Sequence, residues 1–273
     1  MHIIRLLTLI LLTNYPFISF SAEMKQCDTV ECKKHFKKYK KYARVGYADA
    51  MSALGEFYYH GYGTDKNLRK SLSMFKRATK YGAYSAPVKV ALLSLTEPSL
   101  QNIDDAFKYL KKAAKQNHPD ANFLLGMMYY SKKFGNYKLD LSDKHLSSAY
   151  LLKHHSINSF IHHIKTNNDF TDKNFPLLTS VIETDKNEKS IRHIKKKSEM
   201  AKHSSSPDDI EIISIQGPTL KEIFTQQFEI FNQTSPERTT GTGTMISGRS
   251  CDEMISCSTV SKQDFKRMLN TIN

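Results

Sequence analysis

Ser73 and Lys76 have the spacing of an acylating serine and its base. They form a Ser-x-x-Lys motif, as found in penicillin-binding enzymes. The partner motifs of those enzymes, Ser-Asp-Asn and Lys-Thr-Gly, do not occur in the chain. Ser73 also falls inside a predicted helix, beside the apolar residues Leu72 and Phe75. The pattern favours a structural role, and a β-lactam-binding or cell-wall-modifying enzyme is the alternative function.

Four histidines and a glycine-rich run offer the other candidate chemistry. If His154, His155, His162 and His163 share one helix, His155 and His162 lie on one face but roughly 10 Å apart along the axis. A zinc site prefers ligands four residues apart and a third ligand. The run Gly241–Gly248 lacks the third glycine of a dinucleotide fingerprint. We therefore expect no catalytic residue, no cofactor and no metal.

The cysteines indicate local disulfides. Asp28 and Glu31 predict a capping box at a helix start, which would bring the cysteine before the cap next to the one in the first turn. The second pair encloses a loop of five residues. We expect the pairings 27–32 and 251–257, with a clamp between the two ends and a zinc site as alternatives. The cysteines are Cys27, Cys32, Cys251 and Cys257.

The first residues predict export. Arg5 precedes the apolar run Leu6–Leu12, Pro16 follows, and Ser19–Ser21 offers small residues for cleavage. The apolar run is about 10 residues, short of the about 20 that span a bilayer. We expect a signal peptide over residues 1–21 and a periplasmic or secreted protein, with an uncleaved anchor as the alternative. Disulfides persist in such compartments.

The formal net charge of +13 comes mostly from lysine. In a cytosolic protein such a charge would suggest nucleic acid, which an exported chain seldom meets. We expect no nucleic acid and a weak contact with anionic envelope surfaces. Lysines on solvated helix faces, without any binding role, explain the charge equally well. A further alternative for the function is a secreted factor that binds host or anionic envelope surfaces.

The first half of the chain repeats itself at a period of about 36 residues. Ala50, Ala86 and Ala121 recur at spacings of 36 and 35, and each unit reads as two amphipathic helices joined by a turn. One such hairpin cannot bury its own apolar stripe, so neighbouring units must stack.

Residues 46–86 resemble the Sel1-like repeat, a relative of the tetratricopeptide repeat. The later units depart from the pattern, since the second has Val90-Ala91 in place of Leu-Gly and a turn without glycine. The resemblance covers residues 46–155 and implies about three stacked hairpins, an α-solenoid with a concave protein-binding surface and no catalysis of its own. It rests on Ala50, Leu54, Gly55, Tyr58, Gly61, Gly63, Ala78, Gly82, Ala86, Ala113, Ala121, Leu125, Gly126 and Tyr129.

The remaining segments predict additions to this solenoid. We expect an N-terminal capping helix over 22–45, a helical cap and linker over 156–204, and a C-terminal appendage over 205–273. In the appendage, Ile210–Ile215 indicates a strand, and Thr219 with Glu222 indicates a capping box that opens an amphipathic helix. The predicted fold is mainly α, an α-solenoid with a small disulfide-bearing C-terminal α+β extension.

These observations predict an exported, non-catalytic adaptor for protein–protein interaction. We expect one protein partner and a monomeric chain. Exposed aromatic and lysine side chains on the first helix of each repeat would line a basic concave groove.

Overall fold

The computed structural model describes residues 24–200 and 218–234, with side chains placed up to residue 188 in the first range. The predicted signal peptide, Cys251 and Cys257, the glycine-rich run and the predicted strand at 210–215 lie outside these residues.

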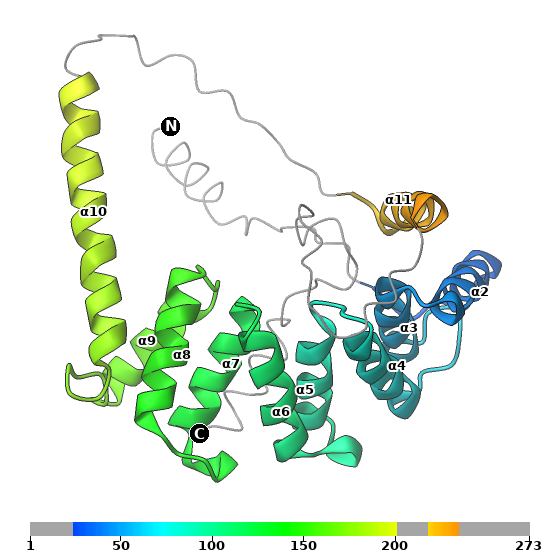
Figure 1. Cartoon of the computed structure of the whole chain (residues 1–273), viewed down its shortest axis with the longest axis horizontal. Helices are drawn as coiled ribbons and strands as arrows, with labels where there is room; N and C mark the ends of the chain where they lie inside the picture. Colours follow the sequence, from blue (N-terminus) through cyan, green and yellow to red (C-terminus); the bar gives the residue numbers. More distant parts are fainter. Residues whose placement is uncertain (1–23, 201–217, 235–273) are drawn as a thin grey trace, which may run out of the picture.

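Helices follow one another side by side through the described part of the chain (Figure 1). That part contains no strand beyond an isolated bridge between Cys27 and Tyr62. None of its helices combines the length and the apolar character that crossing a membrane requires. The elements are α2 (Val30–Val45), α3 (Ala48–His60), α4 (Leu68–Lys80), α5 (Ala86–Thr96), η2 (Pro98–Leu100), α6 (Ile103–Ala114), α7 (Pro119–Tyr130), η3 (Lys132–Phe134), α8 (Leu139–Leu151), α9 (Ile157–Thr166), α10 (Pro176–Met200) and α11 (Leu220–Gln233).

The turn that leads into each hairpin repeats with the sequence period. A left-handed or positive-φ residue ends the preceding helix each time, at Gly46 (φ 122°), Gly82 (φ 90°), Asn117 (φ 57°) and Lys153 (φ 56°). Glycine tolerates this region best, asparagine next, and lysine pays a steric cost. The conformation of this turn therefore repeats once more than the residue types do, and Lys153 leads into α9.

The second helix of each of the first three pairs also starts in the same way. The residues before α4, α6 and α8 are Asn67, Asn102 and Lys138, with φ of −150°, −157° and −149°. Each donates its backbone N–H to a carbonyl near the end of the preceding helix, at 2.7 to 2.9 Å. The two asparagine side chains also accept a hydrogen bond from the backbone N–H three residues further along the chain, at 2.9 Å. A lysine side chain has no acceptor and cannot do this.

Small residues let the two helices of a pair approach closely. A Cβ added to Gly55 in α3 would lie 2.5 Å from the Phe75 ring in α4, and one added to Gly126 in α7 would lie 2.6 Å from Leu146 in α8. Two alanine columns, both fully buried, continue this packing through the stack: Ala50, Ala86 and Ala121, and Ala78, Ala113 and Ala149.

The first helices of the repeats are largely buried, which differs from the predicted exposed groove. Most residues of α3, α5 and α7 are inaccessible, because these helices pack on their own hairpin partner and on the neighbouring hairpin. Basic side chains lie instead on the second helix of the first repeat, since α4 carries five lysines and arginines and no acidic residue.

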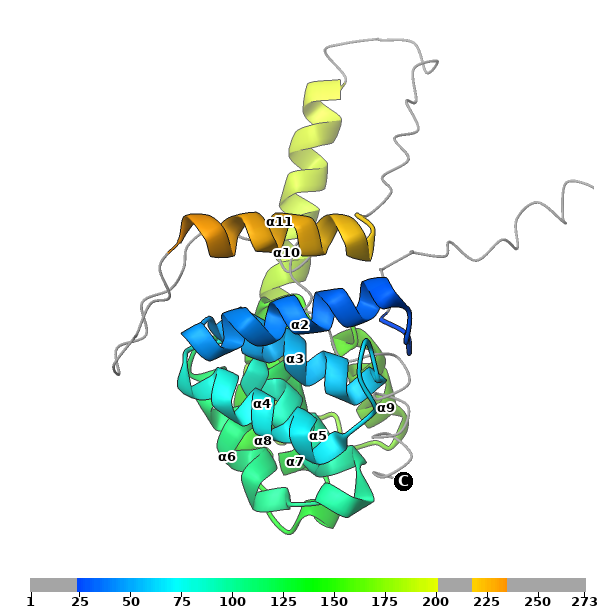
Figure 2. The ribbon, with the colours of Figure 1, turned by 90° about the vertical axis from the view of Figure 1, so that its right-hand side faces the viewer.

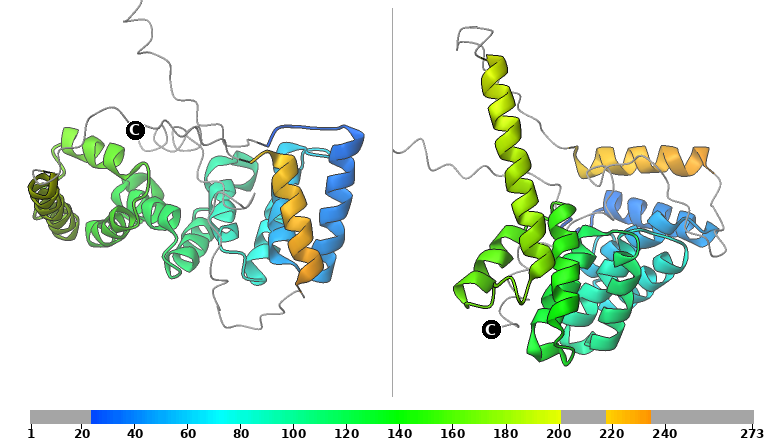
Figure 3. Two further views of the ribbon diagram at one scale, coloured as in Figure 1. Left: turned by 90° about the horizontal axis from the view of Figure 1, so that it is seen from above. Right: turned by 60° about the vertical axis from the view of Figure 1, so that its left-hand side comes forward.

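At the far end of the stack, α10 projects beyond the other helices (Figure 3). Its start is held by Asp143 of α8, whose carboxylate accepts the backbone N–H groups of Leu177 and Leu178 at 2.9 and 2.8 Å. Asp143 is buried, so a side chain from one hairpin caps the helix of the next.

At the N-terminal end of the stack, Cys27 and Cys32 are joined by a disulfide. The predicted cap at Asp28 was wrong by one residue: Thr29 is the N-cap and accepts from the Cys32 N–H at 3.3 Å, while Asp28 is exposed and pairs with Lys33. Gly63 donates to the Cys27 carbonyl at 2.6 Å, and a Cβ there would meet the Cys32 carbonyl at 2.2 Å. The turn after α3 therefore holds the disulfide loop by close backbone contact.

Helix α11 lies alongside α2, almost 190 residues away in sequence (Figure 2). The predicted capping box is confirmed, because Thr219 and Glu222 accept from each other's backbone N–H. The predicted apolar face docks on α2 and α3: Phe228 lies 4.9 Å from the buried Tyr39 ring and Phe224 lies 5.7 Å from Phe57. Helix α11 thereby covers the apolar end of the solenoid, as terminal caps do in repeat proteins.

Candidate binding site

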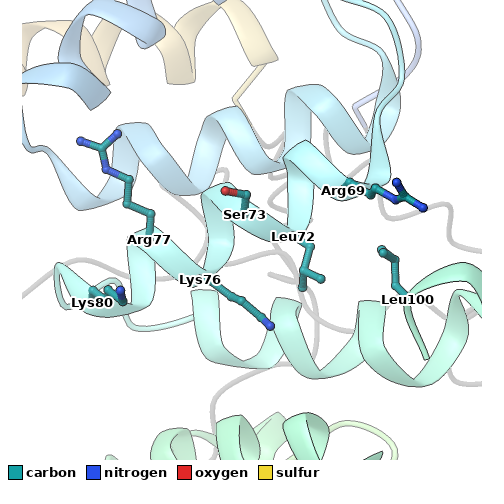
Figure 4. Close-up of a pocket in the computed structure, with 7 residues that line it drawn as sticks. All are labelled: Arg69, Leu72, Ser73, Lys76, Arg77, Lys80 and Leu100. Atoms are coloured by element: carbon teal, nitrogen blue, oxygen red, sulfur yellow. The ribbon is translucent and has the colours of Figure 1, made fainter. Parts of the chain in front are cut away.

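The Ser-x-x-Lys motif lies on the outer face of α4. Ser73 is exposed, and Figure 4 shows its hydroxyl and the Lys76 amine pointing in different directions. The Lys76 Nζ is 2.6 Å from the Asp105 carboxylate on α6. Lys76 thus ties two neighbouring hairpins together, and the pair does not have the geometry of a nucleophile with its base.

The same face of α4 forms one side of an open groove of about 470 Å³ (Figure 4). The groove runs from the start of α4 to its last turn, with η2 of the next repeat opposite. The lining side chains recur at intervals of three and four residues, so they share one helix face. They are Arg69, Leu72, Ser73, Lys76, Arg77, Lys80 and Leu100.

The groove is positively charged with an apolar floor. Leu72 and Leu100 face each other across it, and no acidic side chain lines it. Within the described residues, Lys76 is the one groove cation that forms an ion pair, whereas Arg69, Arg77 and Lys80 form none there. Such an arrangement attracts an anionic group and can bury a small apolar one.

A second cluster of charged groups joins the first helices of neighbouring repeats. The buried carboxylate of Glu56 in α3 lies 2.9 Å from the Lys89 amine in α5 and 3.5 Å from His60. Burial would raise the pKa of this carboxyl, but Lys89 and His60 outweigh that effect and hold it below its ordinary value. Glu56 therefore stays ionised as an inter-repeat contact.

The four histidines do not share one helix. His154 and His155 lie in the turn between α8 and α9, and His162 and His163 lie within α9, because the left-handed Lys153 ends the preceding helix turn. His154 pairs with Asp120 of α7 at 3.4 Å and stacks on a phenylalanine ring. The described residues hold no group of three or more side chains suited to a metal ion.

Another buried histidine, His118, stacks on Tyr84 with ring centroids 4.5 Å apart. Burial lowers the pKa of His118, with a smaller opposing effect from Asp120. In α8 of the same hairpin, burial, followed by the charges of Lys144 and Lys111, lowers the pKa of His145 to about 4. These rings therefore act as packing groups at neutral pH.

Sequence reasoning had singled out Ser73 and Lys76 but missed the other groove residues. The available signal was the basic stripe at positions 69, 76, 77 and 80 of one amphipathic helix, which has no acidic residue to balance it. Leu100 could not be found in this way, because η2 enters the groove only through the stacking of two repeats.

The geometry defines a helical-repeat scaffold with a basic groove between two of its hairpins. The family model described as Sel1 repeat matches residues 48–80, 96–118 and 119–131. These three segments of the chain therefore carry Sel1 repeats.

Among solved structures, the chain is similar to a protective antigen present in uropathogenic Escherichia coli strains that displays an SLR fold. The two share 23% identity, with a TM-score of 0.46, over 55% of this chain and 33% of the other. The match thus spans about a third of that protein's length. No curated protein matched the chain.

Proposed function

We propose that the chain is an exported, non-catalytic adaptor that holds a partner protein on its Sel1-repeat solenoid. The observation that carries the proposal is the open groove on α4 and η2, built between two stacked repeats and lined by basic and apolar side chains. Stacked helices supply a rigid surface of this kind without any moving part.

Two features support export and a binding role. The apolar segment near the start of the sequence has the pattern of a secretory signal, and the Cys27–Cys32 disulfide suits an oxidising compartment. The Ser73 hydroxyl is not paired with the Lys76 amine, which favours binding over acylation. We further propose a monomer whose residues 205–273 form a disulfide-bearing extension that includes α11.

The test is recovery of the full chain from fractionated cells, followed by capture of partners from envelope extract under non-reducing conditions. The proposal predicts an envelope or secreted product without its first 21 or so residues, and a specific protein captured over a range of salt concentrations. A cytoplasmic product, or capture of no specific protein at any salt concentration, would contradict it.

A further inference from the structure

We propose that the α4 groove binds an extended acidic segment of a partner protein, with two carboxylates flanking one apolar side chain. This inference rests on the adaptor function and names the chemistry of its partner. It is argued from the charge, the length and the floor of the groove.

The charge of the groove calls for an anionic ligand. Three of its four cations, Arg69, Arg77 and Lys80, form no ion pair with the residues that the structure describes, and α4 itself contributes no acidic residue. Lys76 is already engaged by Asp105 and defines the wall toward α6. Arginine favours carboxylates in particular, because its planar guanidinium can donate two parallel hydrogen bonds.

The length of the groove fits a short extended peptide. Lys80 lies eleven positions after Arg69, and this corresponds to roughly 16 Å along a helix at about 1.5 Å per residue. A strand rises about 3.3 Å per residue, so about five residues span the groove, and alternate side chains point the same way. The first and fifth side chains would then lie about 13 Å apart, close to the roughly 12 Å between the helix positions of Arg69 and Arg77.

The floor of the groove selects the middle side chain. Leu72 lies between the two ends of the basic stripe, and Leu100 lies across the groove near the Arg69 end (Figure 4). A carboxylate there would lose its hydration without a cation beside it, whereas an apolar side chain would bury surface. The geometry therefore assigns the five bound residues of the partner the pattern acidic, any, apolar, any, acidic.

A membrane surface is a poorer occupant than a peptide. Insertion into lipid needs exposed apolar side chains next to the cations. The large hydrophobic side chains exposed on the described residues all lie elsewhere, at Val30, Val45, Tyr84, Tyr137, Leu151, Leu152 and Leu177. The two leucines of the groove are partly buried in its floor.

The test measures binding of a fluorescein-labelled seven-residue peptide with glutamates at its second and sixth positions, leucine at its fourth and serine elsewhere. Fluorescence anisotropy with the full chain should show saturable binding that weakens with salt. The triple variant Arg69→Gln, Arg77→Gln, Lys80→Gln should bind about tenfold more weakly, because each exposed ion pair contributes up to about 1 kcal/mol.

The matched control removes the same charge from α2, as Lys34→Gln, Lys37→Gln, Lys41→Gln, and should bind like the parent chain. These three lysines are exposed on a helix that does not line the groove. Equal weakening in both variants would show unspecific charge attraction and overturn the inference. No binding of the peptide, binding of the glutamine version equally well, or binding of phosphatidylglycerol vesicles in its place would also overturn it. The adaptor function would survive these outcomes if the full chain still captured an envelope protein.

Discussion

At the residue scale, Glu56 is the buried charge on which two repeats depend. Its carboxylate lies between Lys89 and His60, and 7% of the side chain is exposed. Because its folded pKa is lowered, its ionisation stabilises the fold above the unfolded pKa of 4.5, and this stabilisation is lost as the pH falls through the folded value.

We predict that Lys89→Met lowers the free energy of unfolding by about 3 kcal/mol at pH 7, since it leaves a buried carboxylate with His60 alone. The loss should shrink at pH 4, where the carboxyl of the variant is protonated. Urea denaturation at the two pH values measures this. The double variant Glu56→Gln, Lys89→Met should recover part of the stability, and a loss that is equal at both pH values would contradict the assignment.

The His145 ring gives a second pH-dependent contribution. Its pKa is lowered to about 4 in the folded state, so between that value and the ordinary 6.5 the unfolded chain binds the extra proton and stability rises with pH. His145→Gln should reduce the slope of stability against pH in this window. Urea midpoints at several pH values measure the slope. His162→Gln, at an exposed position of α9, should leave it as in the parent chain.

At the element scale, the turns show where the repeat pattern is imperfect. Lys153 holds the left-handed position that Gly46 and Gly82 hold in earlier turns. We predict that Lys153→Gly stabilises the protein by about 1 kcal/mol, the cost of a left-handed conformation for a residue with a Cβ. Lys144→Gly, in the exposed middle of α8, should destabilise it by about 1 kcal/mol. Thermal unfolding of both variants tests the turn assignment. A melting temperature that falls in both variants would contradict it.

The junction of α8 with α10 depends on one carboxylate. Asp143→Ala should cost about 2 kcal/mol, because the N–H groups of Leu177 and Leu178 lose their acceptor where water has little access. Asp140→Ala, at an exposed position of the same helix, should cost less than about 1 kcal/mol. Chemical denaturation compares the two, and similar losses would mean that the cap contributes little.

At the scale of the whole molecule, the sequence allowed the repeated half of the fold to be predicted. The alanine columns recur at the repeat period, and Gly55 has its counterpart two repeats later at Gly126, because each repeat solves the same close-packing problem with small residues. The turn that leads into α9 was not recognised, since Lys153 stands where earlier turns have glycine or asparagine. Lys138 likewise replaces the asparagine cap before α8, while the backbone keeps the same conformation in both places.

Contacts between distant segments were beyond such reasoning. The apolar stripe of α11 predicted that the helix must dock, but nothing local in the sequence says that it docks on Tyr39 of α2. The groove likewise combines Arg77 of one repeat with Leu100 of the next. Periodicity reveals each element, whereas the site between elements depends on how they stack.

We propose that this solenoid holds its partner protein at the α4 groove. The most direct measurement places a photo-cross-linking amino acid at Ser73, inside the groove, or at Lys41, on α2, in the full chain in intact cells. The account predicts a discrete cross-linked protein adduct from position 73 that is absent from position 41. No adduct from position 73, or the same adducts from both positions, would contradict it.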